Sequence, residues 1–196
     1  VYYLTWFLEQ GFDVMTFDYR GYGQSEGEVD RAGLIADSLL VLQYAHKHFF
    51  EQKIILLGQS LGGAKLSVAL SQYPQQNVFS MLILDSTFYS YRSVVRRKIA
   101  SIWPLWPFQY PLAFLFSDQN SPKNNYANIS IPIFLTHGTA DPVVPFDEAE
   151  DIYSELQQHK NTKFFKFTSK QHLAAFSWPK APAAKAFLKF WQDKAR

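Results

Sequence analysis

Apolar residues follow two different patterns along the chain. Short runs rich in Val, Ile, Leu and Phe alternate with longer segments in which apolar residues recur every three or four positions. The first pattern is typical of buried strands and the second of amphipathic helices. We therefore expect strands at Phe12–Asp18, Lys53–Leu57, Phe79–Leu84, Ile131–Thr136 and Lys163–Thr168.

Helical spacing fills the intervals between these strands. It predicts helices at Val1–Gln10, Asp30–Phe49, Leu61–Tyr73, Asp147–Gln158 and Pro182–Lys194. Gly11 and Pro74 stand where the first and third of these helices should end. The alternation of strand and helix predicts the α/β class, with a mostly parallel sheet and right-handed crossovers.

Residues 86–130 interrupt this alternation, because they are too long for an ordinary connection. We interpret them as a small helical cap inserted over the sheet. Three roles are open for the aromatic rings of the cap. The rings could pack the cap onto the body, or they could line an apolar acyl pocket, with Trp103, Trp106 and Phe108 as candidate substrate-binding residues.

The third role is a membrane-surface patch, in which Arg96, Arg97 and Lys98 would accompany the rings. The sequence favours it least, because Pro104, Pro107 and Pro111 exclude one continuous amphipathic helix. Membrane contact is therefore an open but unsupported prediction.

Composition narrows the class of protein further. A length of 196 residues corresponds to one domain, residues 1–196, and 47% hydrophobic with 18% charged residues indicates a folded chain. The net charge of +2 argues against a nucleic-acid partner. The absence of Cys excludes thiolate metal sites and Cys nucleophiles, so a nucleophile has to be an oxygen or an amine.

The segment Gly58-Gln59-Ser60-Leu61-Gly62 fits the pattern G-x-S-x-G and lies between a predicted strand and a predicted helix. In that context the pattern indicates a nucleophile elbow, a sharp turn that exposes the serine. Ser60 is the candidate nucleophile, and the backbone N–H of Leu61 is a candidate oxyanion donor. A glycine-rich turn with an incidental serine is the alternative.

A serine nucleophile needs a base, and the base needs an acid that orients it. In folds with this elbow the chain order is Ser, then Asp or Glu, then His. Asp141 follows the strand Ile131–Thr136, and His172 follows the strand Lys163–Thr168. We predict Asp141 as the acid and His172 as the base.

Other histidines and one other carboxylate compete for these roles. His46, His48 and His159 lie near helix ends, where a surface position is expected, and His137 precedes the acid, which favours a structural role. Asp85 ends a strand and stays open as an alternative acid.

The loop after the first predicted strand contains Gly21-x-Gly23, which is part of a dinucleotide fingerprint. Glu26 occupies the position that the third glycine of that fingerprint requires. A nucleotide-binding domain is therefore disfavoured, and no organic cofactor or metal is expected.

The elbow, the predicted triad order and the segments DYRGYGQSEG, HGTADPVVP and LILDSTF together resemble the α/β-hydrolase superfamily. The pattern is most similar to the Bem46-like serine hydrolases, some of which act on lipid esters or acylated proteins. The resemblance implies helices on both faces of the sheet, the triad Ser60, Asp141 and His172, and a small-molecule or lipid-like ester substrate.

The resemblance also implies that the first three strands of the family lie outside residues 1–196. The third of them would lie between Phe12–Asp18 and Lys53–Leu57. Three outcomes are open: a longer chain supplies it, a second chain supplies it in an oligomer, or the two flanking strands pair directly. The loop after it carries the second oxyanion donor, so we expect residues 1–196 alone to be nearly inactive.

The function expected from the sequence is a serine hydrolase that cleaves carboxylic esters or thioesters with apolar acyl groups. A peptidase and a non-catalytic binding module with the hydrolase fold are the alternatives. A cytoplasmic location is the expectation, although any signal or anchor would precede Val1.

Overall fold

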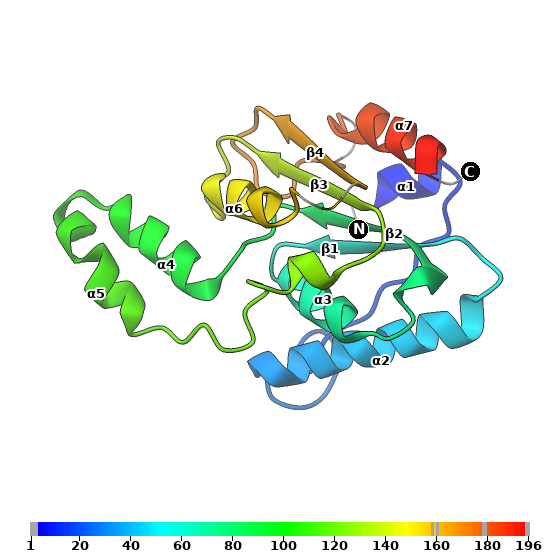
Figure 1. Cartoon of the computed structure of the whole chain (residues 1–196), viewed down its shortest axis with the longest axis horizontal. Coiled ribbons are helices and arrows are strands. Elements are labelled where there is room, and N and C mark those ends of the chain that lie inside the picture. The colour runs from blue at the N-terminus through cyan, green and yellow to red at the C-terminus, as the bar shows by residue number, and fades with distance from the viewer. Residues whose placement is uncertain (1–3, 158, 160, 178–179, 195–196) are drawn as a thin grey trace.

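A four-stranded parallel sheet forms the centre of the molecule (Figure 1). The computed structural model describes residues 4–157, 159, 161–177 and 180–194. Each strand pairs in parallel with the next one along the chain, so all carboxyl ends meet at one edge of the sheet. The predicted α/β class is confirmed. The strands are β1 (Ile54–Gln59), β2 (Phe79–Asp85), β3 (Ile133–Gly138) and β4 (Thr162–Phe167).

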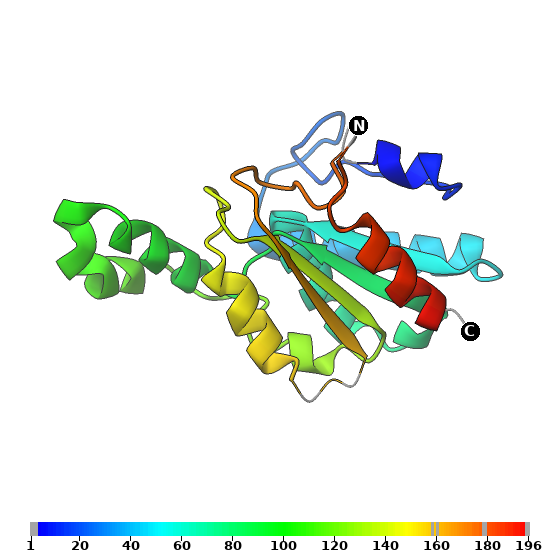
Figure 2. The ribbon, with the colours of Figure 1, turned by 90° about the horizontal axis from the view of Figure 1, so that it is seen from above.

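Helices cover both faces of the sheet (Figure 2). One apolar core joins the sheet to α2 (Arg31–Phe49), α3 (Leu61–Gln72) and α6 (Asp147–Glu155). A second core joins the opposite face to α1 (Thr5–Glu9) and α7 (Ala184–Lys194). None of the described helices is both long and apolar enough to cross a bilayer.

A capping side chain sets the start of α2. The Asp30 carboxylate accepts hydrogen bonds from the N–H groups of Ala32 and Gly33, which fixes the start of α2. A short 3₁₀ helix, η1 (Gln76–Val78), leads into β2. Residues 1–3 and 158, which belong to predicted helices, lie outside the described residues.

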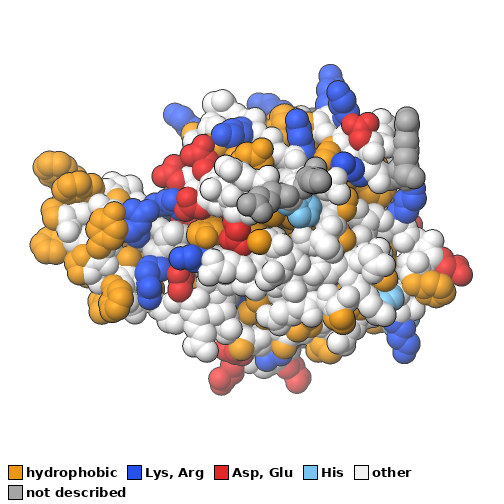
Figure 3. All heavy atoms as spheres, viewed as in Figure 1, with side chains coloured by type: hydrophobic (Ala, Val, Ile, Leu, Met, Phe, Trp, Pro, Cys, Tyr) orange, Lys and Arg blue, Asp and Glu red, His pale blue; other side chains and the backbone are white. Residues whose placement is uncertain are grey.

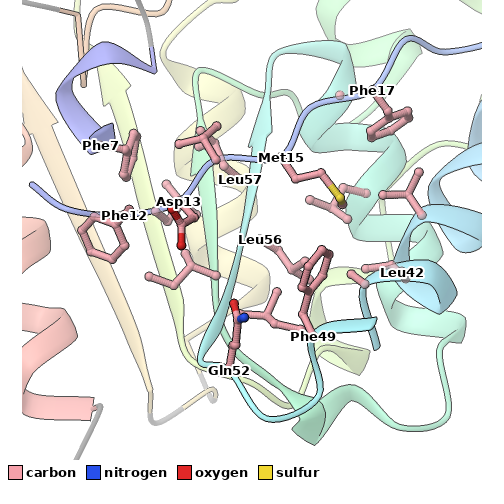
Figure 4. Close-up of a pocket in the computed structure, with 18 of the residues that line it drawn as sticks. Phe7, Phe12, Asp13, Met15, Phe17, Leu42, Phe49, Gln52, Leu56 and Leu57 are labelled. Carbon is pink, nitrogen blue, oxygen red and sulfur yellow. The ribbon is translucent and has the colours of Figure 1, made fainter. Parts of the chain in front are cut away.

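The prediction of a strand at Phe12–Asp18 is wrong, because residues 12–18 join no sheet. A strand requires a partner for its backbone groups, and β1 pairs only with β2 among the described residues. Direct pairing of the two segments, one of the three open outcomes, is thereby excluded. An apolar cavity of about 480 Å³ separates them, lined by Phe12 and Met15 on one side and Leu56 and Leu57 on the other (Figure 4).

The cap consists of short helices that pack on one another. They are α4 (Tyr91–Ala100), η2 (Trp103–Phe108) and α5 (Gln109–Phe114), and η3 (Tyr126–Asn128) leads back to the sheet. The hairpin of α4 and α5 projects away from the body, on the side where the carboxyl ends of the strands lie (Figures 1 and 2). The inserted helical cap is present, but it extends outward.

A buried carboxylate fastens the base of the cap to α6. Glu148 is fully buried and accepts hydrogen bonds from the N–H of Tyr89 (3.0 Å) and the hydroxyl of Ser93 (2.6 Å). Arg97 of α4 forms ion pairs with Glu148 and with Asp151. Charged groups that are this deeply buried are stable only when they are paired, so the base of the cap has one fixed position.

The aromatic cluster between α1 and α7 gives a test of the second core. Phe187 is fully buried and its ring lies 5.9 Å from Phe7 and 5.7 Å from Phe134. We expect Phe187→Ala to lower the free energy of unfolding by about 3–5 kcal/mol, since it leaves a cavity at this junction. Urea denaturation checks this value. Phe50→Ala, at an exposed position, is the control, and equal effects of the two substitutions would contradict the prediction.

Candidate active site

Ser60 occupies a strained turn between β1 and α3. Its φ of 50° and ψ of −123° are disfavoured for a residue with a Cβ. Two contacts hold the turn: the Ser60 N–H donates to the carbonyl of Asp85, the last residue of β2 (3.0 Å), and the hydroxyl of Thr87, which follows β2, donates to the Ser60 carbonyl (2.8 Å). This is the geometry that a nucleophile elbow requires.

The elbow depends on a close approach between the end of strand β1 and the first turn of helix α3. A Cβ on Gly58 would lie 2.5 Å from the Gly63 Cα, and a Cβ on Gly63 would lie 2.8 Å from the Thr87 Cβ. Neither position has room for a side chain. Gly62 differs, because a Cβ there would meet no atom within 4 Å.

Asp141 and His172 form a hydrogen-bonded pair at the same edge of the sheet. The distance between Asp141 Oδ2 and His172 Nδ1 is 2.7 Å. The other carboxylate oxygen accepts hydrogen bonds from the N–H groups of Val143 (2.8 Å) and Val144 (3.0 Å). With all these partners the carboxylate is held rigidly, and the imidazole is oriented with its Nε2 away from Asp141.

Burial by itself would raise the pKa of Asp141. The hydrogen bonds from His172, Val144 and Val143 to the ionised carboxylate outweigh burial, so the pKa of Asp141 lies below its ordinary value. Asp141 is therefore negatively charged at neutral pH, as an acid that supports an imidazolium must be.

His137 has a structural role in this loop. It is completely buried and its Nε2 lies 3.0 Å from the Val144 carbonyl, which places the N–H on that nitrogen. Burial lowers the pKa of His137, so its ring is neutral. Its contact with Val144 steadies the turn that donates to Asp141.

Asp85, the alternative acid, has other partners. It is fully buried at the end of β2 and accepts hydrogen bonds from the Gln59 side chain (3.0 Å) and the Ser86 hydroxyl (3.1 Å). Burial raises the pKa of Asp85 to about 6, although these two hydrogen bonds oppose the effect. His172 therefore forms its hydrogen bond with Asp141 and not with Asp85.

The oxyanion candidate and the competing histidines complete the set of predicted residues. Leu61 is the first residue of α3, so its N–H lies at the start of that helix. No hydrogen bond joins Ser60 to His172 within the described part of the chain. The competing histidines bond elsewhere: His46 to Tyr73, His48 to the Tyr44 carbonyl and His159 to Thr162.

Sequence reasoning missed the role of Thr87. Its hydroxyl clamps the elbow, and its side chain fills the space beside Gly63. The run Asp85-Ser86-Thr87, three polar residues directly after a buried strand, was the available signal.

The three candidate substrate-binding rings of the cap lie apart from the elbow. Trp103, Trp106 and Phe108 are exposed on the projecting part of the cap, and they are not packed onto the body as one interpretation expected. Pro104 and Pro107 lie inside η2, a short 3₁₀ helix, so this stretch forms no long amphipathic helix. A role in substrate binding stays a prediction.

The described residues contain no group of three or more His, Asp or Glu side chains arranged to hold a metal ion. The apolar cavity beside β1 includes neither Asp141 nor His172 in its lining.

The parallel sheet, the elbow and the Asp–His pair define an α/β hydrolase. The chain belongs to the prolyl oligopeptidase family, whose model matches residues 2–196.

Individual relatives agree with this classification. The chain is 32% identical to protein YfhR of Salmonella typhimurium over 186 residues, which cover 89% of this chain and 59% of YfhR. It is 27% identical to the lysophosphatidylserine lipase ABHD12 of Danio rerio, over 88% of this chain and 49% of the lipase. The chain therefore spans only about half to three fifths of the length of these two relatives.

Among solved structures, the Pyrococcus furiosus esterase Pf2001 has a similar fold, with a TM-score of 0.71 and 21% identity. The match covers 97% of this chain and 72% of the esterase. The α/β-hydrolase fold expected from the sequence is confirmed.

Substitutions at Gly62 and Gly63, neighbours in α3, test whether the elbow has space for a side chain. We expect Gly63→Ala to lower the free energy of unfolding by about 1–3 kcal/mol, because its Cβ would collide with Thr87. Gly62→Ala, the matched control, should be neutral or stabilising by up to about 1 kcal/mol, since alanine favours helix. Chemical denaturation of both variants checks this. Equal stabilities would show that the elbow has space for a side chain.

Asp85 should make stability depend on pH. Its pKa is about 6 in the folded protein against an ordinary value of 3.8, so the folded state binds more protons and stability falls as pH rises from about 4 to 6. Asp85→Asn should remove up to about 3 kcal/mol of this decline. Unfolding curves across this pH range provide the measurement, with Asp193→Asn on the surface of α7 as the control. Parallel profiles of wild type and Asp85→Asn would refute the assignment.

Proposed function

We propose that this chain carries the catalytic residues of a serine hydrolase that cleaves carboxylic esters or thioesters with apolar acyl groups. The observation that carries the proposal is the 2.7 Å hydrogen bond between Asp141 and His172, at the edge of the sheet where the elbow presents Ser60. Family membership supports it, because the chain matches the prolyl oligopeptidase family over residues 2–196.

In the proposed reaction, Ser60 Oγ attacks the carbonyl carbon of the substrate while His172 Nε2 accepts the hydroxyl proton. The imidazolium that forms is stabilised by Asp141, whose pKa is already low. His172 then donates the proton to the leaving alcohol or thiol. Water, deprotonated by His172, hydrolyses the acyl-enzyme and restores Ser60.

Negative charge develops on the carbonyl oxygen during both steps. The N–H of Leu61 is available for it, because the first N–H groups of a helix have no intrahelical partner. One donor stabilises the oxyanion less than two donors do, and removal of one such donor costs about 10²–10³ in kcat. Full activity would then require a second donor beside Leu61.

The names of the relatives support an ester as substrate. ABHD12 is a lysophosphatidylserine lipase and Pf2001 is an esterase. A lipid-like ester agrees with the Ser–His–Asp chemistry.

A peptidase is the second candidate. The family takes its description from prolyl oligopeptidase, and amide hydrolysis uses the same nucleophile, base and acid. An assay panel of 4-nitrophenyl esters of increasing acyl length, acyl thioesters and a prolyl peptide substrate separates the candidates. Preference for longer acyl esters supports the proposal, and preference for the peptide favours the second candidate.

We expect Ser60→Ala in the full-length protein to reduce ester hydrolysis by a factor on the order of 10⁶, because the nucleophile is removed. The same substitution should abolish covalent labelling by a fluorophosphonate. Ser154→Ala, at an exposed serine of α6, is the matched control and should leave both unchanged. Labelling that persists in a folded Ser60→Ala protein would refute the assignment, and an unlabelled, folded wild type would favour a non-catalytic module.

A further inference from the structure

The tip of the cap, which we define as residues 102–116, concentrates apolar surface. It contains nine of the nineteen exposed large hydrophobic side chains of the described chain. Trp103 is 88% exposed, Leu115 78% and Phe114 73%. Single exposed apolar residues are ordinary, but a cluster of aromatic rings on one projecting segment marks an interaction surface.

We propose that the tip of the cap docks on the surface of an anionic phospholipid bilayer. Figure 3 shows the apolar side chains gathered at the end of the projecting hairpin, with Lys and Arg side chains between them and the body. Rings at the end and cations behind them are the arrangement of an interfacial membrane anchor, in which the rings enter the acyl boundary and the cations meet lipid phosphates.

Charge along the cap supports an anionic partner. Residues 86–130 contain Arg92, Arg96, Arg97 and Lys98 but only a single carboxylate, Asp118, which accepts a hydrogen bond from the Arg92 backbone N–H (3.0 Å). Arg97 is neutralised by Glu148 and Asp151 of α6. Among the described residues, no carboxylate forms an ion pair with Arg92 or Arg96, so their charges remain available to lipid phosphates.

The contacts of these two arginines place them beside the apolar tip. The Arg92 guanidinium lies 5.2 Å from the centre of the Phe114 ring, and the Arg96 guanidinium lies 5.5 Å from the centre of the Tyr110 ring. A cation stacked on a ring next to exposed apolar side chains fits the boundary between acyl chains and headgroups.

The shape of the tip favours a bilayer over a second copy of the chain. A narrow projection offers a protein partner little flat area, whereas a bilayer admits aromatic side chains to a depth of about 5–10 Å. The tip contains none of the elbow or Asp141–His172 residues. The inference therefore goes beyond the proposed function and does not depend on it.

Vesicle flotation tests the proposal. The protein is expressed without any segment that itself spans a membrane. We expect it to float with vesicles of phosphatidylcholine and phosphatidylglycerol in equal parts. Trp103→Ser combined with Trp106→Ser should weaken binding about ten-fold or more, since two large rings no longer enter the membrane. Arg92→Gln and Arg96→Gln should each weaken binding about five-fold on these vesicles only, and not on pure phosphatidylcholine.

Matched controls separate the effect of the tip from that of other exposed apolar side chains, and docking from catalysis. Leu40→Ser with Tyr44→Ser removes apolar side chains on α2 that are 61% and 51% exposed, and it should leave flotation unchanged. Ser60→Ala should float like wild type, which separates docking from catalysis. Circular dichroism verifies folding, and Trp103→Ser alone replaces the double variant if the latter unfolds.

Three results would overturn the proposal. The first is that the wild-type protein does not float with the vesicles. The second is that the α2 control variant loses as much vesicle binding as the Trp103 and Trp106 double variant. The third is that the wild type binds no vesicles but forms an oligomer, which Trp103→Ser dissociates. The last result would identify the tip as an interface between copies of the chain.

Discussion

The contact between the end of β1 and the start of α3 is the constraint on which the active edge depends. Because Gly58 and Gly63 approach each other without side chains, the chain reverses direction within a few residues and Ser60 is forced to a positive φ. The same contact brings Thr87 against the elbow, so that the segment after β2 shares in holding it. The parallel order of the strands then places the loop of Asp141 and the loop of His172 at this edge.

The cap has a fixed base and a free tip, and these two parts serve different purposes. At the base, Phe88 packs with Val144, and Lys98 of α4 donates a hydrogen bond to the Pro142 carbonyl. Both body residues belong to the turn that orients Asp141. A displacement of α4 would therefore reach the acid directly. Among the described residues, no hydrogen bond or ion pair joins the tip to the body, and its rings are exposed.

Much of this arrangement could be predicted from local sequence patterns. The four described strands and the helices between them follow from apolar periodicity, and the elbow and the Asp141–His172 pair follow from chain order at the ends of strands. The strand at Phe12–Asp18 failed because apolar composition says nothing of whether a pairing partner exists. The exposure of Trp103 could not be foreseen either, since aromatic residues suggest burial unless the direction of the segment is known. The membrane patch ranked last on the sequence because the three prolines of the cap exclude one continuous amphipathic helix, and that criterion does not anticipate a projecting hairpin.

The aromatic cluster of the second core has a consequence for biosynthesis. Trp6 and Phe7 of α1 pack on Phe176 and Phe187, which follow them by about 170 to 180 residues. During translation Trp6 and Phe7 can contact each other and Phe12 early, but their contacts with Phe176 and Phe187 must wait for those residues, and a contact of such long range closes slowly. The second core is therefore completed only when these distant segments of the chain meet, and until then its aromatic surface is partly uncovered.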